Sequence, residues 1–255
     1  MTGDPTRRFS DRVENYVKYR PRYPPAFLAC LRQACGLTPA SVIADVGSGT
    51  GILSELFLKN GNSVLAVEPN DAMRQAAEAR LSHYPNFTSI NGPAEATTLP
   101  DRSVDFITAG QSFHWFEAQR AKAEFTRILR PGGYVVLVWN RQRVGATPFM
   151  SSYTALLERY ALDYHSVKHT KESVDEDIAL LFDGQMQVRS FPNEQRFDFE
   201  GLRGRLLSSS YAPLPDHPHY EPMMAELRRL FDIHEENGQI VFKYETHLYF
   251  SQVFP

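Results

Sequence analysis

Five short apolar runs occur between residues 40 and 140, and most are separated by segments with a helical repeat. The runs are SVIADV, SVLAVEP, FTSING, SVDFITAG and YVVLVWN, and the intervening segments include ILSELFLKNG and NDAMRQAAEARLSHYP. Apolar strands that alternate with helices are typical of βαβ units, in which helices cover both faces of a parallel sheet. The sequence therefore predicts an α/β fold built on a parallel sheet.

The boundaries of several elements are marked by residues that start or stop helices. The segment AFLACLRQACG follows two prolines and is predicted as a helix that ends at Gly36. Asn70 or Asp71 is placed to cap the helix predicted in NDAMRQAAEARLSHYP. A further helix is expected in FEAQRAKAEFTRILRPGG, with its end at Pro131 and the two glycines that follow.

The pattern changes after Asn140. Residues 147–183 have a helical pattern, MQVRSFPNEQRFDF is predicted as a long strand, and EPMMAELRRLFDIH as an amphipathic helix. QIVFKYETHLYFSQV alternates apolar and polar residues and is predicted as a strand. No repeat or low-complexity linker separates these parts, which favours a single domain over residues 1–255.

Composition excludes several classes of protein. A formal net charge of -3 and a pI near 6.2 do not suit a surface that neutralises phosphates, so no nucleic-acid partner is expected. No apolar run is long enough for a membrane span and the start lacks a secretion signal, so we expect no membrane partner and a cytoplasmic location. Cys30 and Cys35 lie on different sides of a predicted helix, which favours two core thiols over a disulfide, and no metal site is expected.

The motif Asp45-Val46-Gly47-Ser48-Gly49-Thr50-Gly51 follows the first apolar run. Three glycines allow a tight turn and a close approach of the backbone to a ligand, at the strand end where open α/β sheets bind ligands. A dinucleotide fingerprint has its third glycine where this chain has Ile52. The carboxylate of Asp45 would repel a pyrophosphate and attract an ammonium group. Spacing and charge therefore disfavour a nicotinamide cofactor.

Glu68 ends the second apolar run, about 20 residues beyond the glycine turn. An acidic residue at this position can accept hydrogen bonds from the hydroxyls of a ribose. The alternative is an ordinary solvated acidic residue at a strand end, which the neighbouring glycine turn disfavours. Together, the turn and Glu68 indicate a ligand that carries ribose hydroxyls.

These motifs resemble a known family. VIADVGSGTG, VLAVEPNDAMRQAA, GPAEATTLPDRSVDFITAGQSFHWF and EFTRILRPGGYVVLVWN are, in this order, similar to the class I S-adenosylmethionine (SAM)-dependent methyltransferases of the type 11 small-molecule group. The preceding YRPRYP is a short match to members related to trans-aconitate methyltransferase. The resemblance implies a Rossmann-like sheet of seven strands, five of them parallel. Strands near 187–198 and 240–252 would form a hairpin that adds one antiparallel strand.

The resemblance also implies a role for individual residues, with SAM as cofactor. Asp45 and the backbone of Gly47, Ser48, Gly49, Thr50 and Gly51 would hold the methionyl part, and Glu68 the ribose. Met73, Ala94 and Glu95 would surround the adenine, and Gly110 and Gln111 would lie near the sulfonium. Many relatives have an acidic residue just before the Ala-Glu pair, where this chain has Pro93, so Glu95 or a backbone carbonyl would have to replace it.

The acceptor side is predicted from the remaining residues. In the resulting division, residues 1–36 form an N-terminal lid segment and helix, residues 40–140 the SAM-binding core, and residues 141–255 the acceptor side. His114 could act as a general base if the acceptor must lose a proton, and the alternative, which a single histidine favours, is a helix-capping or core histidine beside Trp115. Tyr16, Tyr19 and Arg20 are candidates for a lid that contacts SAM or the acceptor, or for a solvated basic arm.

The function predicted is methyl transfer to a small molecule, on an oxygen of a carboxylate or a phenol-like group. Two alternatives stay open at this point. One is a SAM-binding regulatory protein without transferase activity, and the other is a nicotinamide-dependent oxidoreductase. An acceptor cavity beside the sulfonium would favour the enzyme. The sequence does not decide the oligomeric state.

Overall fold

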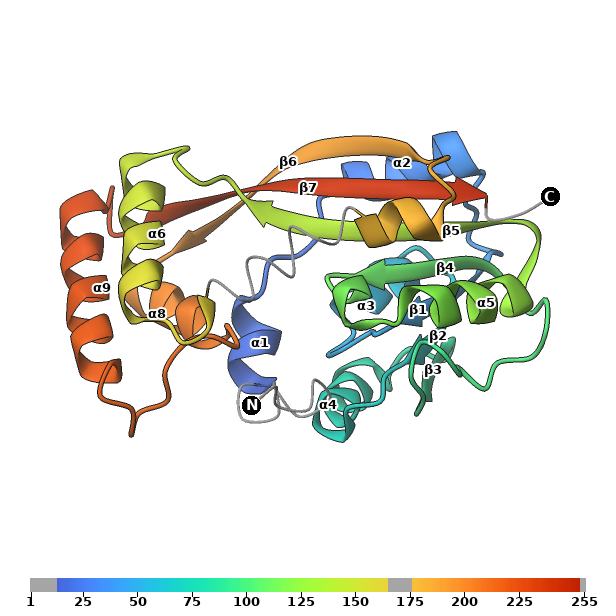
Figure 1. Cartoon of the computed structure of the whole chain (residues 1–255), viewed down its shortest axis with the longest axis horizontal. Coiled ribbons are helices and arrows are strands. Elements are labelled where there is room, and N and C mark those ends of the chain that lie inside the picture. The colour runs from blue at the N-terminus through green and yellow to red at the C-terminus, as the bar shows by residue number, and fades with distance from the viewer. Residues whose placement is uncertain (1–12, 165–175, 253–255) are drawn as a thin grey trace.

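The computed structural model describes residues 13–164 and 176–252, which form a seven-stranded sheet with helices packed around it (Figure 1). The strands are β1 (Val42–Val46), β2 (Ser63–Val67), β3 (Phe87–Ile90), β4 (Val104–Gly110), β5 (Leu129–Gln142), β6 (Gln187–Phe197) and β7 (Ile240–Gln252). The helices are α1 (Val13–Tyr19), α2 (Ala26–Cys35), α3 (Ile52–Lys59), α4 (Asp71–Leu81), α5 (Ala118–Ile128), α6 (Pro148–Tyr160), α8 (Phe199–Leu207) and α9 (Tyr220–His234), and residues 176–181 are also helical.

The strand order is β3-β2-β1-β4-β5-β7-β6. Strands β1 to β5 are parallel, and β7 lies antiparallel between β5 and β6. The prediction of a Rossmann-like sheet with five parallel strands and a terminal antiparallel hairpin is therefore confirmed. The chain runs outward from β1 to β3 and then returns to β4 on the other side of β1. This reversal leaves a crevice at the carboxyl ends of β1 and β4, where ligands bind in open α/β sheets.

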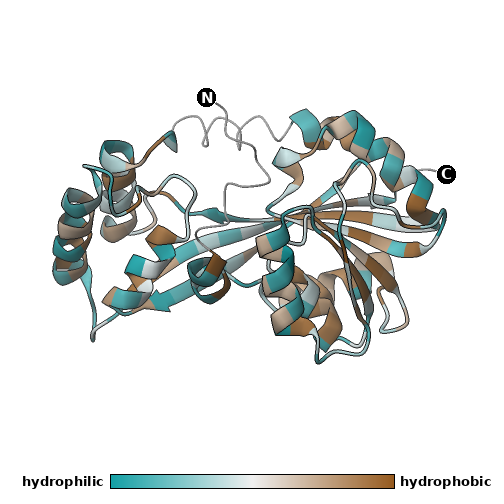
Figure 2. Ribbon diagram, turned by 90° about the horizontal axis from the view of Figure 1, so that it is seen from below, coloured by the Kyte–Doolittle hydropathy of each residue, from teal (hydrophilic) through white to brown (hydrophobic). Residues whose placement is uncertain are grey.

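Both faces of the central parallel strands are covered, which explains why β1 and β4 are almost continuously buried and largely apolar (Figure 2). One face packs on α2 and α3 through residues such as Phe27, Phe57 and Ile43. The other packs on α5 and on residues 178–182, with Phe125 and Ile107 in its centre. The helices thus fix the positions of β1 and β4, whose carboxyl ends border the crevice.

Strands β6 and β7 extend beyond the parallel core toward α6, α8 and α9, which gather at one end of the molecule (Figure 1). A third apolar cluster fills this end, with Tyr153, Phe242 and Tyr244 fully buried. Helix α1 lies between this group and α4 (Figure 1). The C-terminal part of the chain is therefore brought next to the carboxyl ends of the parallel strands.

Some element boundaries differ from the predictions. Helix α5 ends at Ile128 and not at the Pro131 turn, because Leu129 already pairs with Val104 across a register shift in β5. Within residues 147–183, the first helix ends at Tyr160, and residues 165–175 lie outside the described residues. Helices α1 and α8 were not predicted. Asp198 caps α8, since its side chain accepts a hydrogen bond from the Gly201 amide at 2.8 Å.

Other local predictions can be checked directly. Gly36 ends α2 in the left-handed conformation, and the Asn70 side chain caps α4 by accepting from the Met73 amide at 3.0 Å. Both cysteines are free thiols. Cys35 is buried, and burial raises its pKa to about 12, whereas Cys30 is only half-buried. Within the described ranges, no helix has the length and apolarity needed to cross a membrane.

Candidate functional site

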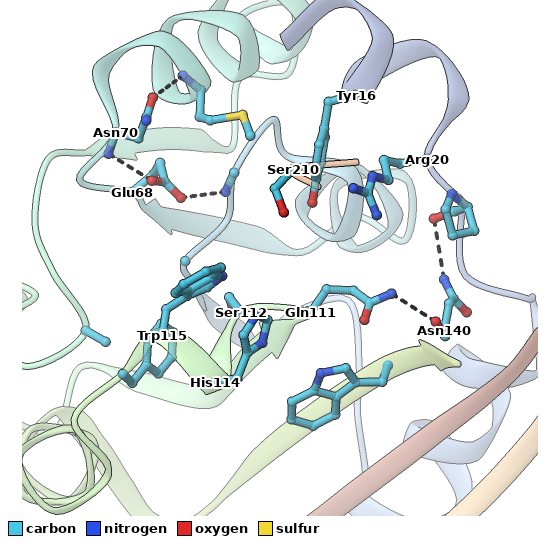
Figure 3. A pocket seen from close by; sticks show the side chains of 18 of the residues that line it. Tyr16, Arg20, Glu68, Asn70, Gln111, Ser112, His114, Trp115, Asn140 and Ser210 are labelled. Carbon is cyan, nitrogen blue, oxygen red and sulfur yellow. Dashed lines mark hydrogen bonds between the residues drawn. The ribbon is translucent and has the colours of Figure 1, made fainter. Parts of the chain in front are cut away.

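A cavity of about 490 Å³ opens at the crevice between β1 and β4 (Figure 3). A smaller extension of about 40 Å³ reaches down toward the start of α3. The two share several lining residues, namely Tyr16, Arg20, Pro21, Gly47, Gly49, Gly110 and Gln111. Of the predicted cofactor-binding and catalytic residues, all but Gly51 line one space or the other.

The glycine turn forms one wall of both spaces. The amides of Gly47 and Ser48 donate to the Val67 carbonyl at 2.9 and 3.1 Å, which ties the turn to the end of β2. Gly49 has a φ of +56°, and no atom lies within 4 Å of the position that a Cβ would take. A side chain at this cavity-lining position would therefore project into open space. Gly51 does not line the cavity and instead caps α3.

Glu68 is 8% exposed and lies at the end of β2. One carboxylate oxygen accepts from the Gly49 amide and the other from the Asn70 amide, both at 2.8 Å (Figure 3). Burial raises the pKa of this carboxyl group. Each oxygen retains a lone pair, because a carboxylate can accept about four hydrogen bonds. Glu68 is therefore a positioned acceptor in the wall of the cavity.

Asp45 is fully buried at the end of β1 and lines the small extension. Its oxygens accept from the hydroxyls of Ser54 at 2.6 Å and Thr108 at 3.0 Å. Burial raises the pKa of Asp45 to about 6 despite these two hydrogen bonds. A buried carboxylate held only by neutral groups would be stabilised by a cationic ligand.

Three polar atoms around the extension have no hydrogen-bond partner within the described residues. They are Oγ of Ser48, Oγ1 of Thr50 and Nε of Arg20, and all three are buried. Buried polar groups are normally paired, and unpaired ones cost about 1–3 kcal/mol each. Their convergence on one space indicates a site for a ligand that carries its own polar groups.

The carboxyl end of β4 and the residues that follow it form another wall of the large cavity. A methyl group at Gly110 would lie 2.5 Å from the Tyr23 hydroxyl, so only glycine fits there. Gln111 has a φ of +61°, a conformation that costs a non-glycine residue about 1 kcal/mol. Its amide donates to the Val138 carbonyl at 2.9 Å, which holds this turn against β5. His114 follows in the short 3-10 helix η3 (Phe113–Trp115) and lines the large cavity.

The three residues predicted around an adenine all line the large cavity. Met73 is buried in the first turn of α4, and Ala94 is buried beside Pro93 in the loop after β3. Glu95 also lines the cavity, but its Oε1 accepts from the Glu117 amide at 2.7 Å.

The N-terminal segment lies across the cavity. Tyr16 and Arg20 line it, and the Arg20 guanidinium lies 4.8 Å from the centre of the Tyr16 ring. Tyr19 does not line it. Its ring packs against Gly204 of α8 and its carbonyl accepts from Gln195. Of the three candidate lid residues, the structure thus brings two to the cavity.

Asn140 fastens this segment to the end of β5. Its side-chain amide lies 3.4 and 3.3 Å from the carbonyls of Pro21 and Arg22, and its oxygen accepts from Thr246 at 2.5 Å and Asn193 at 3.0 Å. In the sequence, only its position at the end of a predicted strand marks Asn140, and the sequence analysis did not assign it a role.

We expect Asn140→Asp to lower the free energy of unfolding by about 2 kcal/mol, because a carboxylate cannot donate to the two carbonyls and repels them. Denaturant titration measures the loss, and hydrogen exchange should show faster exchange in residues 16–23. Unchanged exchange in that segment would contradict the assignment. Asn86→Asp, which removes one donor to the Asn62 carbonyl at the other end of the sheet, is the control.

The C-terminal part supplies a wall that sequence reasoning did not assign to particular residues. Tyr164, Arg205, Ser210 and Tyr211 line the large cavity together with Trp139 of β5. They lie far apart in the sequence and have no shared motif. Only the docking of α8 beside α1 brings them to the same space.

Comparison with known proteins shows which proteins this chain resembles in sequence and fold. Residues 44–137 match the model of a methyltransferase domain. An uncharacterized methyltransferase of Schizosaccharomyces pombe is 26% identical over 98% of both chains. An uncharacterized methyltransferase of Mycobacterium bovis is 37% identical over 54% of each chain. A solved protein described as a type II methyltransferase, from Anaeromyxobacter dehalogenans, has the same fold with a TM-score of 0.63 and 24% identity, over 93% of this chain and 99% of that one.

The matched domain and the relative that spans this chain identify it as a SAM-dependent methyltransferase, and its fold is that of a solved methyltransferase. Its cofactor is SAM, and residues 44–137 are the methyltransferase domain at its core. The predicted class, activity and cofactor are thereby confirmed.

Proposed function

We propose that this enzyme methylates a small molecule on an oxygen, either of a carboxylate or of a phenol-like group. The observation that carries the proposal is the continuity of the large cavity, whose lining includes Gly49 and Glu68 as well as Trp139 and Tyr211. A cofactor in one part would leave the other part free for an acceptor. A net charge of -3 supports a small molecule over a nucleic acid, and we also propose a cytoplasmic location.

The cofactor would be held by the predicted residues. The buried, unpaired hydroxyls of Ser48 and Thr50 and the open approach to Gly49 suit its methionyl part. Glu68 offers two anchored oxygens to the ribose hydroxyls. Met73, Ala94 and Glu95 would surround the adenine, and Gly110 with Gln111 would lie near the sulfonium. Gly51 would contribute indirectly, by starting α3.

When bound, SAM supplies a methyl group on a sulfonium for in-line displacement. The chain's task is to orient the acceptor and exclude water. A carboxylate acceptor has no proton to lose, so it needs no base. A phenol-like acceptor does, and His114 would accept that proton at a ring nitrogen. We propose that residues 1–255 act as a single domain, which the uninterrupted sheet supports.

Two measurements test the function. Calorimetric titration with SAM, S-adenosylhomocysteine and NADH should give binding of the first two only, and binding of NADH alone would contradict the cofactor assignment. Incubation with methyl-labelled SAM and a panel of carboxylic acids, phenols and amines should label an acid or a phenol. Methyl esters lose the label in base and aryl ethers do not, which separates the two classes. Labelling of amines alone would overturn the oxygen assignment.

The buried carboxyl group of Asp45 makes the free energy of unfolding depend on pH. Its pKa is about 6 in the folded chain, above the ordinary 3.8, so between about pH 4 and 6 the folded state binds more protons than the unfolded one. The contribution of Asp45 to stability therefore falls as pH rises through that window, by on the order of 3 kcal/mol. We expect Asp45→Asn to remove this pH dependence, measured by denaturant titration at pH 4.5 and 7.

The same variant tests the contact with the cofactor. Because the SAM ammonium favours an ionised Asp45, we expect its affinity to rise from pH 5 to 7 in the wild type. Asp45→Asn should weaken binding at pH 7 by about tenfold or more. Asp105→Asn is the control, since Asp105 accepts from Val42 and Arg130 away from the cavity. A dissociation constant unchanged in Asp45→Asn would refute the contact.

A further inference from the structure

Arg205 is a buried cation in the wall of the large cavity. It belongs to α8 and is 3% exposed. Nε donates to the Tyr244 hydroxyl at 2.9 Å and Nη1 to the Ser209 hydroxyl at 3.1 Å, and the guanidinium lies 5.4 Å from the centre of the Phe242 ring. All of these partners are neutral. Arginine stays protonated in proteins, so its charge is present without a counter-charge from these groups.

Arg20 reaches the same place from the N-terminal segment. Its Nη2 donates to the carbonyl of Ser208 at 2.7 Å, next to the serine that accepts from Arg205. Burial lowers the pKa of Arg20, and the nearby charge of Arg205 lowers it further. Two guanidinium groups that approach one another in a protected space repel, so the free protein bears an electrostatic cost there.

No acidic side chain of the described residues offsets this charge. Neither arginine forms a salt bridge with an acidic residue within residues 13–164 and 176–252. In the same ranges, the acids that line the large cavity are Glu68 and Glu95, and both lie on the cofactor side. The cavity is therefore acidic at the end proposed for the adenosine and basic at the end formed by Arg20 and Arg205. A bound anion would remove the imbalance.

The arginines still have donors to offer. Within the described residues, Nε and Nη1 of Arg20 and Nη2 of Arg205 donate no hydrogen bond. Figure 3 shows Arg20 with Tyr16 and Ser210 on the side of the cavity away from His114 and Trp115. Guanidinium groups bind carboxylates through two parallel hydrogen bonds, and such charge-assisted bonds are about twice as strong as neutral ones. The chemistry that suits this place is a carboxylate.

We propose that Arg20 and Arg205 form a subsite that binds a carboxylate of the methyl acceptor, a conclusion that rests on the proposed function. Arg20 and Arg205 line different parts of the site. Arg20 lines both the large cavity and the small extension near the proposed methionyl site, whereas Arg205 lines only the large cavity. Arg205 is thus the residue that determines acceptor specificity, and its replacement should leave cofactor binding intact.

The test uses the protein saturated with S-adenosylhomocysteine. Benzoate and succinate are titrated in parallel with benzamide, succinamide and inorganic phosphate. The chain has two tryptophans, Trp115 and Trp139, and both line the cavity, so intrinsic fluorescence reports its occupancy. We expect at least one of the carboxylates to bind at least about tenfold more tightly than its amide. Arg205→Gln should remove this preference and change the affinity for S-adenosylhomocysteine less than about threefold.

Two further variants separate binding from a structural role of Arg205. Tyr244→Phe removes a hydrogen bond that holds the guanidinium but keeps the charge, so it should lower stability and preserve the carboxylate preference. Arg205→Lys keeps the positive charge but loses the planar guanidinium that can donate two parallel hydrogen bonds. It should therefore retain part of the preference for carboxylate over amide. The subsite is refuted if wild type binds carboxylate and amide equally or not at all, if Arg205→Gln binds carboxylate like wild type, or if phosphate binds more tightly.

The subsite and the proposed function fail in different ways. Binding of carboxylates does not require methyl transfer. A carboxylate preference that depends on Arg205, without labelling of any oxygen acceptor, would support the subsite and refute the function. Oxygen methylation of an acid that Arg205→Gln leaves unchanged would support the function and refute the subsite.

Discussion

Substitution of Gly49 by arginine is expected to abolish SAM binding while the chain remains folded. Gly49 has a φ of +56° and free space where its Cβ would lie, and it lines both the large cavity and the small extension. An arginine would fill that space and place a cation beside the turn proposed to hold the cationic SAM. Calorimetric titration should detect no binding, a loss of at least about a hundredfold from micromolar affinity.

A matched glycine provides the control. Gly238 also has a positive φ, of +76°, and free space at its Cβ, but it lies in the turn before β7, away from the cavity. Gly238→Arg should carry a similar backbone cost of about 1 kcal/mol and leave SAM affinity at the wild-type value. If Gly49→Arg binds SAM as tightly as Gly238→Arg, the glycine turn is not the cofactor site.

The second large effect is expected from Glu68→Ala. Two charge-assisted hydrogen bonds to the ribose would be lost, each worth about 1.5–3 kcal/mol, so SAM affinity should fall by about a hundredfold or more. The variant also leaves the amides of Gly49 and Asn70 without their acceptor, which loosens the turn that faces the cofactor.

Loss of stability alone could mimic this result, and Glu124→Ala excludes that explanation. Glu124 has the same exposure of 8% and also accepts from a backbone amide, that of Thr97 at 2.7 Å. It lies outside the residues that line the cavity. Both variants should lose stability, and only Glu68→Ala should lose SAM. Wild-type affinity in Glu68→Ala would falsify the ribose assignment.

Local sequence was sufficient for the parallel core. Strands β1, β2 and β4 are short apolar runs followed by helical segments, so their burial in the sheet can be derived without long-range information. The glycine turn and Glu68 could be predicted for the same reason, since a ligand at a strand end depends on residues within one βαβ unit. The end of α5 was predicted wrongly because pairing of Leu129 with Val104 outweighs the helix-stop signal at Pro131.

The acceptor side could not be predicted in the same way. Tyr19 was grouped with Tyr16 and Arg20 by proximity in the sequence, yet Tyr19 and Arg20 are adjacent residues whose side chains point to different sides, and Tyr19 packs on Gly204. Arg205 follows no motif. Its position depends on the packing of α8 against α1 and β7, contacts between segments more than 150 and about 40 residues apart in the sequence.

The sequence by itself determined the sheet, the cofactor end of the cavity and the class of enzyme, because each depends on hydrophobic periodicity and on motifs contained in short segments. Tertiary structure alone decided which side chains meet at the other end. Residues 16–23, the end of β5 and residues 205–211 come together there through long-range packing, and the charge left in that space is a property of none of the three segments taken separately.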